Sequence, residues 1–222
     1  MNIQKSEIQI NVNGKSANAY LADGGGAGVL VLHAWWGLSL SFKQVCDRLA
    51  EQGYTALAPD LYLGDIAKTI DEAKALLGKY DNELKGSIVK AAKEHLALFR
   101  PDKPIAAVGF SMGAGWALDM AENDPNVSAV IMFYGAGEAD YDKVKAKVLG
   151  HFAEVDEWEP LDYVKEMEQA MKDGGVDVTL HFYPKVAHWF MESDRPEYDS
   201  ETAQLAWKRT FEFLNTTLRG GS

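Results

Sequence analysis

The sequence predicts an α/β protein in which a mostly parallel, twisted sheet carries helices on both faces. Short apolar runs alternate along the chain with longer segments of helical periodicity, which is the pattern of repeated strand–helix units. Residues 29–32 (Val-Leu-Val-Leu) form an uninterrupted apolar run, as expected for a strand that is buried on both faces. A length of 222 residues suits one large domain, so we expect residues 1–222 to form a single domain.

The first half of the chain begins with a predicted hairpin. Apolar and polar residues alternate over 7–12 and over 17–21, and Asn13-Gly14 between them is a typical two-residue turn. The elements predicted to follow are a strand at 29–33, a helix at 41–52, a strand at 55–58 and a helical stretch at 69–99 with a break near Asp81.

The second half continues the alternation. Its predicted elements are a strand at 104–109, a helix at 112–122, strands at 128–134 and 146–152, a helix at 159–173, a strand at 176–183 and a helix at 199–215. The segment between the strands 128–134 and 146–152 is short, so it leaves no room there for an inserted cap domain. No internal repeat or low-complexity tract interrupts the sequence, which again favours one domain.

Charge and cysteine content narrow the function classes. The formal net charge of −11 argues against a nucleic-acid partner, because phosphates require clustered Lys and Arg, and it disfavours anionic membranes. Cys46 is the only cysteine, so no internal disulfide can form and a reducing compartment fits best. The sequence has no apolar signal region and no segment of membrane-spanning length. We therefore expect a cytoplasmic monomer or homodimer without a nucleic-acid or membrane partner.

The stretch Gly109-Phe-Ser-Met-Gly matches the G-x-S-x-G pattern, in which a serine occupies a sharp strand-to-helix turn. A strand is predicted to end at Phe110 and a helix to begin at Met112, as this motif requires. Glycines suit both flanking positions because a side chain would collide with the backbone of so tight a turn. An ordinary turn with small residues for close packing is the alternative. The context favours Ser111 as a nucleophile.

A serine hydroxyl needs a base to take its proton and an acid to orient that base. His188 is the preferred base, because it lies in the loop between the last strand and the last helix, where parallel sheets collect catalytic residues. His33, which ends a strand, is the second candidate. The other histidines fall within a predicted helix or within strands: His95, His151 and His181.

Asp156 is the preferred acid among Glu154, Asp156 and Glu157, because it lies in the loop after the strand 146–152 and before the next helix. A solvated acidic turn is the alternative for this segment. The order Ser111, Asp156, His188 is the chain order of the α/β-hydrolase triad.

Acyl transfer also needs two backbone N–H groups that hold the developing oxyanion. We expect one from Met112, at the N-terminus of a helix where the dipole favours an anion. We expect the second from the loop after the strand 29–33, most reasonably from Trp35.

Six stretches occur in a characteristic order and spacing: HAWWGL, APDLYLG, GFSMGAGWAL, MFYG, AEVDEWEP and YPKVAHWF. Through them the sequence resembles the dienelactone hydrolase family of α/β-hydrolases over nearly its whole length. This resemblance implies an eight-stranded sheet without a cap and a catalytic triad on Ser111, Asp156 and His188.

The sequence also departs from that family's pattern. The namesake enzymes have a cysteine nucleophile where this chain has Ser111, and a glutamate where it has Ala34. They hold a substrate carboxylate with two arginines, and the matching positions here are Gly64 and Glu192. An acidic residue in place of an arginine is expected to repel a carboxylate, so a neutral ester fits better than the family's namesake substrate.

Aromatic residues suggest the character of the substrate pocket. Core packing is the default role of any single tryptophan, but four of the six fall within three residues of a proposed catalytic position: Trp35, Trp36, Trp158 and Trp189. We expect them to line an apolar pocket, together with Tyr62 and Tyr134, which each follow a strand.

The predicted function is a serine carboxylesterase that hydrolyses small neutral or aromatic esters through an acyl-enzyme. A lactone or dienelactone hydrolase is one alternative, and a non-catalytic ligand-binding protein of the same fold is another. The sequence lacks a dinucleotide-binding fingerprint, a P-loop and metal-ligand motifs. Hydrolysis by a Ser-His-Asp triad needs no cofactor and no metal ion, and we expect none here.

Overall fold

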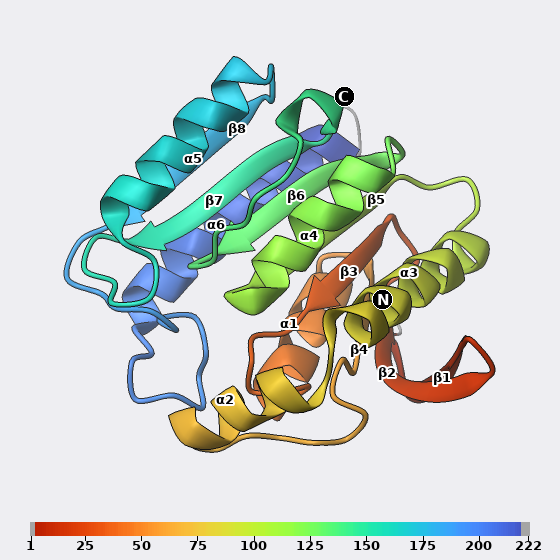
Figure 1. Cartoon of the computed structure of the whole chain (residues 1–222). Coiled ribbons are helices and arrows are strands. Elements are labelled where there is room, and N and C mark those ends of the chain that lie inside the picture. Colours follow the sequence, from red (N-terminus) through yellow and green to blue (C-terminus); the bar gives the residue numbers. More distant parts are fainter. Residues whose placement is uncertain (1–2, 219–222) are drawn as a thin grey trace. The chain divides into compact units, whose positions relative to one another are not determined.

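The computed structural model of this chain describes residues 3–218. Within that range, eight strands belong to one mixed, mostly parallel sheet, and six α-helices connect or follow them along the chain. This confirms the predicted fold class. The chain groups into two compact units, Met1–Ile105 and Ala106–Ser222, which are described separately (Figure 1). A single domain over 1–222 stays a prediction.

The first unit contains four strands in the order β1-β2-β4-β3: β1 (Gln4–Val12), β2 (Lys15–Asp23), β4 (Thr55–Pro59) and β3 (Gly28–Leu32). β2 is antiparallel to β1 and β4, whereas β3 and β4 are parallel. The turn residues Asn13 and Gly14 have φ values of 51° and 81°, the left-handed geometry that Asn-Gly adopts in two-residue hairpins. Every residue of β3 and β4 is buried, which explains their apolar sequences.

Three helices complete this unit: α1 (Leu40–Glu51), α2 (Ile70–Lys79) and α3 (Asn82–Phe99). The break predicted near Asp81 separates α2 from α3. The Asp81 carboxylate accepts a hydrogen bond from the Leu84 N–H at 2.7 Å, and so caps α3. Tyr80 has extended backbone dihedrals and ends α2. The two helices are therefore distinct elements with their own start and stop signals.

The second unit contains the strands β5 (Ile105–Phe110), β6 (Val127–Phe133), β7 (Lys147–Ala153) and β8 (Val178–Tyr183), in that order. β6, β7 and β8 are parallel, so their carboxyl ends lie at one edge. The helices are α4 (Met112–Asn123), α5 (Leu161–Asp173) and α6 (Ser200–Leu218). In Figure 1, α4 and α5 lie in front of these strands and α6 lies behind them. Between β6 and β7 the chain forms one short 3-10 helix, η1 (Tyr141–Lys143).

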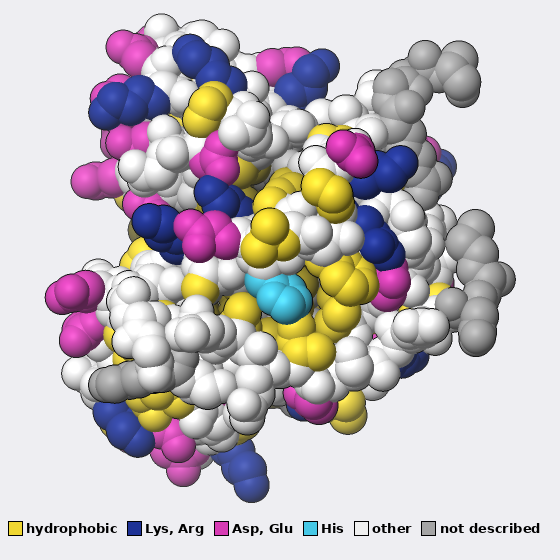
Figure 2. Space-filling view, turned by 90° about the vertical axis from the view of Figure 1, so that its right-hand side faces the viewer, with side chains coloured by type: hydrophobic (Ala, Val, Ile, Leu, Met, Phe, Trp, Pro, Cys, Tyr) yellow, Lys and Arg dark blue, Asp and Glu magenta, His cyan; other side chains and the backbone are white. Residues whose placement is uncertain are grey.

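The predicted boundaries of the helices and strands differ from the observed ones by three residues at most. Figure 2 shows acidic and basic side chains scattered over one face of the molecule, with hydrophobic side chains gathered around a histidine. The negative net charge is therefore not collected into one patch on this face. No helix in the described range is both long and apolar enough to cross a membrane.

Candidate active site

Three side chains of the second unit form a continuous hydrogen-bonded row. The distance from His188 Nε2 to Ser111 Oγ is 2.9 Å, and the distance from His188 Nδ1 to Asp156 Oδ2 is 2.8 Å. A carboxylate only accepts hydrogen bonds, so Nδ1–H donates to Asp156 and Nε2 accepts from the serine hydroxyl. The structure thus brings together the three residues that the sequence analysis selected, from the loops after β5, β7 and β8.

Ser111 stands on a strained turn. Its dihedrals are φ 50° and ψ −118°, between the last residue of β5 and the first residue of α4. Its N–H donates to the Phe133 carbonyl of β6 at 2.9 Å, which holds the turn against the sheet. A Cβ on Gly109 would lie 2.2 Å from the Gly113 carbonyl oxygen, so only glycine fits where the turn crosses the helix. Packed elements on both sides therefore impose this conformation.

Gly135, two residues beyond the end of β6, closes the other side of the turn; the sequence analysis quoted it only within the stretch MFYG and gave it no role. A Cβ at this position would lie 2.2 Å from the carbonyl oxygen of Ser111. A glycine just after a buried strand, within that stretch, was the signal in the sequence. The close approach keeps the segment after β6 against the serine.

The Asp156 carboxylate is held by its own loop. Its Oδ1 atom accepts hydrogen bonds from the N–H groups of Trp158 and Glu159, at 2.8 and 3.0 Å. The other oxygen, Oδ2, is left for His188. The side chains of Asp156 and His188 are 1% and 4% exposed, so water does not compete for this bond. The loop sets the direction of the carboxylate, and the carboxylate sets that of the imidazole.

Glu159 links this loop to the segment after β6. Its Oε1 atom accepts a hydrogen bond from the N–H of Ala136 at 3.1 Å. Burial raises the pKa of Glu159 above its ordinary value, against the lowering effects of this hydrogen bond and of His188. The sequence analysis missed Glu159, because nothing in an acidic segment distinguishes a bridging carboxylate from a solvated one. The Glu159 N–H thus binds Asp156, while the Glu159 side chain binds the segment after β6, so Glu159 connects the two segments.

The competing histidines have structural partners. In the first unit, His33 is fully buried; its Nδ1 lies 2.6 Å from the carbonyl oxygen of Ala34, and its Nε2 accepts from the Leu61 N–H at 3.1 Å. Burial lowers its pKa, so it stays neutral. In the second unit, His151 is equally buried and has both ring nitrogens bonded to hydroxyl groups. These contacts explain why the two histidines lie in the core.

Two of the predicted pocket residues contact the His188 imidazole, and a third packs against one of them. The ring of Tyr134 is 5.0 Å from it, and the ring of Trp189 is 4.9 Å from it in an edge-on arrangement. Trp158 lies 5.7 Å from Trp189 and is 39% exposed, whereas Tyr134 is fully buried. Tyr134 therefore supports His188 from the interior, and Trp158 is the residue of this cluster that reaches the surface.

The other predicted pocket residues belong to the first unit. Trp35 and Trp36 are buried and pack edge to face, with ring centroids 5.4 Å apart. Tyr62 is fully buried and stacks on Tyr80 at 5.3 Å, and burial raises its pKa. Their roles in a pocket, and those of the Trp35 and Met112 N–H groups in an oxyanion hole, stay predictions.

Glu192 has an environment that the sequence analysis did not anticipate. Its side chain is buried at 2% exposure, and its Oε1 atom accepts a hydrogen bond from the Tyr134 hydroxyl at 3.0 Å. Its Oε2 atom has no hydrogen-bond partner among the described residues. Burial raises the pKa of Glu192 to about 8, so the neutral form dominates at neutral pH. The sequence analysis expected Glu192 to repel a substrate carboxylate, which requires that Glu192 is ionised. Because burial favours the neutral form, this repulsion is weaker than expected.

Gly64, the other position where the family carries an arginine, lies in the first unit. Its φ of 104° favours glycine. Its N–H donates to Asp60 Oδ2 at 2.5 Å. Among residues 3–218, no cluster of three or more His, Cys, Asp or Glu side chains is arranged to hold a metal ion.

A mostly parallel sheet defines a hydrolase of the α/β type when, as here, a serine on a strained turn after β5 is bonded to a histidine, and that histidine to an aspartate, from later strand ends. The model of the dienelactone hydrolase family matches residues 17–218. The chain belongs to this family.

Curated relatives span the chain. "Protein usf" from Aquifex pyrophilus is 32% identical over 226 aligned positions, covering 95% of this chain and 98% of the relative. A protein of Aquifex aeolicus (strain VF5), named "Putative carboxymethylenebutenolidase", is 30% identical and covers 96% and 98% of the two chains. Among solved structures, a "Putative Dienelactone Hydrolase from Klebsiella pneumoniae subsp. pneumoniae MGH 78578" aligns with a TM-score of 0.84 at 26% identity, covering 96% and 98%.

Proposed function

We propose that this hydrolase is a serine carboxylesterase that cleaves small neutral or aromatic esters through an acyl-enzyme. The observation that carries the proposal is the hydrogen-bonded row from Ser111 Oγ through His188 to Asp156, with both distances below 3 Å. Such a row supplies a nucleophile, a base and an orienting acid in one geometry.

In the first step, the Oγ of Ser111 forms a bond to the ester carbonyl carbon while His188 Nε2 takes the hydroxyl proton. The carbonyl oxygen becomes an oxyanion, and the Met112 N–H at the start of α4 is the donor we propose for it. Asp156 stabilises the imidazolium and keeps the Nδ1–H tautomer in place. When the tetrahedral intermediate collapses, the alcohol leaves with the proton from Nε2.

In the second step, water attacks the acyl-enzyme. His188 Nε2 takes a proton from this water, whose oxygen bonds to the acyl carbon. The acyl–Oγ bond then breaks, and Ser111 regains its proton from Nε2. The products are a carboxylic acid and a regenerated enzyme, and no atom from a cofactor is consumed.

Two features support a neutral or aromatic substrate. Trp189 packs against His188, and Trp158, which packs against Trp189, is 39% exposed, so aromatic surface is available near His188 for an apolar acyl or alcohol group. Neither Gly64 nor Glu192 supplies a positive charge for a substrate carboxylate.

The test compares wild type with Ser111→Ala on p-nitrophenyl acetate and p-nitrophenyl benzoate. We expect kcat to fall by a factor of about 10⁴ or more, because the nucleophile is lost. Circular dichroism and thermal unfolding verify that the variant is folded. A fluorophosphonate probe should label Ser111 in wild type and leave the variant unlabelled. A folded variant with full esterase activity would refute the mechanism. Failure of the probe to label wild type would favour a ligand-binding protein.

Lactone hydrolysis is the second candidate, favoured by the relatives named as carboxymethylenebutenolidases. The same serine can open a ring ester, and the acid and alcohol then remain in one product. A panel of γ-lactones against open-chain esters of equal size separates the two functions through kcat/KM.

A further inference from the structure

A groove on the second unit lies between α5 and the segment that follows β6. Its volume is about 380 Å³, within the range of small-molecule sites. Its main lining side chains are Glu138, Tyr141, Tyr163, Glu166 and Met167. Ser111, Asp156 and His188 do not line it, so the hydrolytic row does not account for it.

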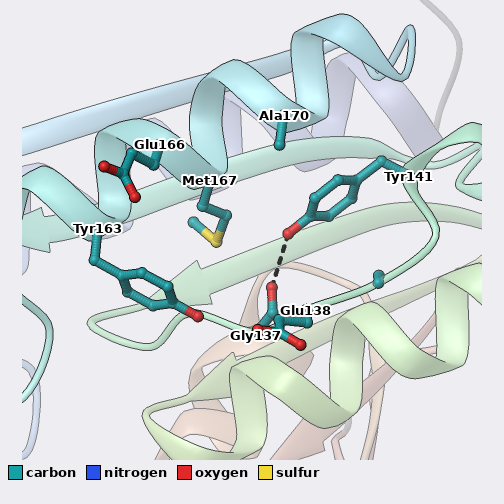
Figure 3. A pocket seen from close by; sticks show the side chains of 8 residues that line it. Gly137, Glu138, Tyr141, Tyr163, Glu166, Met167 and Ala170 are labelled. Carbon is teal, nitrogen blue, oxygen red and sulfur yellow. Dashed lines mark hydrogen bonds between the residues drawn. The ribbon is translucent and has the colours of Figure 1, made fainter.

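The walls of this groove are aromatic and apolar. Figure 3 shows Tyr141 and Tyr163 on opposite sides, with Met167 of α5 between them. The Tyr141 hydroxyl donates to the Gly137 carbonyl at 2.8 Å, which fixes the orientation of its ring. Met167 is buried, whereas Tyr163 is 40% exposed and borders the opening. A ligand would therefore meet a fixed ring at one end and an accessible ring at the other.

The charge of the groove is negative. Glu138 and Glu166 are among its lining residues, and none of those residues is basic. Burial, Tyr163 and Glu138 together raise the pKa of Tyr141 to about 12. Burial raises the pKa of Tyr163 as well, with contributions from Glu159 and Glu138. The field of Glu138 thus reaches both phenol groups.

Two basic side chains of η1 and α5 are engaged with other carboxylates. Lys143 pairs with Asp140 at 2.7 Å, and Lys172 pairs with Glu168 one turn earlier on α5 at 2.7 Å. Neither lysine lines the groove. Among the described residues, neither Glu138 nor Glu166 forms an ion pair with a Lys or Arg side chain.

We propose that this groove binds a small alkylammonium ion. The faces of Tyr141 and Tyr163 offer cation–π contacts, and the carboxylates of Glu138 and Glu166 offer Coulombic attraction to the same charge. Met167 provides apolar contact for alkyl groups on the nitrogen. The net charge of −11 raises the local concentration of cations near the protein. This site goes beyond the proposed hydrolysis, since it needs no covalent chemistry.

The test uses choline and its neutral isostere 3,3-dimethylbutan-1-ol, which has a carbon in place of the nitrogen. Each is titrated into the full-length ¹⁵N-labelled protein, and Kd is read from amide shift changes. We expect choline to shift the amides of Gly137, Glu138 and Met167 and the neutral isostere to bind far more weakly. Because one exposed cation–π contact is worth a factor of about 2 to 5 in Kd, the double variant Tyr163→Leu with Glu166→Gln should weaken choline binding about tenfold.

Two controls separate the groove from other effects. Glu168→Gln lies on the same helix but outside the groove, and should leave the Kd for choline unchanged. Ser111→Ala should also leave it unchanged, so the result does not depend on the proposed hydrolysis. Equal affinity for choline and its neutral isostere, or an unchanged Kd in the folded double variant, would overturn the proposal.

Discussion

The buried carboxyl group of Glu192 makes the stability of the protein depend on pH, and Glu192→Gln isolates that dependence. The side chain is 2% exposed, with one hydrogen bond from the Tyr134 hydroxyl. Burial raises its pKa from the ordinary value of 4.5 to about 8. Glutamine has nearly the same shape and its carbonyl oxygen can accept the same hydrogen bond, but it never ionises.

The magnitude follows from the proton balance between the folded and unfolded states. Below pH 4.5 both states are protonated, so the raised pKa of Glu192 costs nothing. Between pH 4.5 and about 8 only the unfolded chain is ionised, and the free energy of unfolding falls by about 1.4 kcal/mol per pH unit. The full loss is about 5 kcal/mol, and it stays constant above pH 8. The stability gained by Glu192→Gln should therefore grow by about 4 kcal/mol between pH 5 and pH 9.

Urea unfolding, followed by tryptophan fluorescence at several pH values from 5 to 9, measures this difference. Glu212→Gln is the matched control, because it removes the same charge from an exposed position on α6. Its stability relative to wild type should change little with pH. If the difference between Glu192→Gln and wild type stayed constant from pH 5 to pH 9, Glu192 would be ionised in the folded protein. The argument that the buried Glu192 carboxyl group is neutral at neutral pH would then be refuted.

Three further predictions concern the candidate site. Asp156→Asn should lower kcat on p-nitrophenyl acetate by a factor of about 10³–10⁴, because the amide no longer holds the reactive His188 tautomer; an unchanged kcat would contradict the assigned row. Glu159→Ala should lower kcat about tenfold more than Glu159→Gln, because glutamine keeps an oxygen that can accept from the Ala136 N–H. Equal kcat values in the two variants would show that the hydrogen bond from Ala136 to residue 159 does not position the catalytic residues. Gly109→Ala should lower the free energy of unfolding by about 3 kcal/mol or more, since its Cβ would overlap the backbone of α4, whereas a Cβ at Gly115 has its nearest neighbour at 3.8 Å. Thermal unfolding measures the stability of Gly109→Ala and of Gly115→Ala. An equal loss of stability in the two variants would refute the steric argument for Gly109.

The parts of the fold that local patterns encode could be predicted. β3 is an uninterrupted apolar run because both of its faces are buried, and the break at Asp81 is visible because a capping carboxylate is a local feature. The proximity of two triad residues could be predicted because parallel strands end at one edge of a sheet. Asp156 and His188 follow the neighbouring parallel strands β7 and β8, so they were expected to lie close together once these strands were identified.

Other parts of the site could not be predicted, because they depend on contacts between distant segments. Glu159 and Ala136 are bonded across two loops, and no local pattern encodes that pairing. Gly135 is required by its approach to Ser111, which exists only when β6 lies beside β5.

The sequence by itself determined the chemical groups and their order: a serine on a glycine-flanked turn, then an aspartate, then a histidine, each after a strand. Only the tertiary structure decided which carboxyl groups are ionised and how the side chains are oriented. Burial depends on residues far away in the chain, and burial is what raises the pKa of Glu192 and removes the charge expected of it at neutral pH. The backbone N–H groups that aim the Asp156 carboxylate at His188 take their directions from the folded loop, so the geometry of the row is a property of the packed molecule.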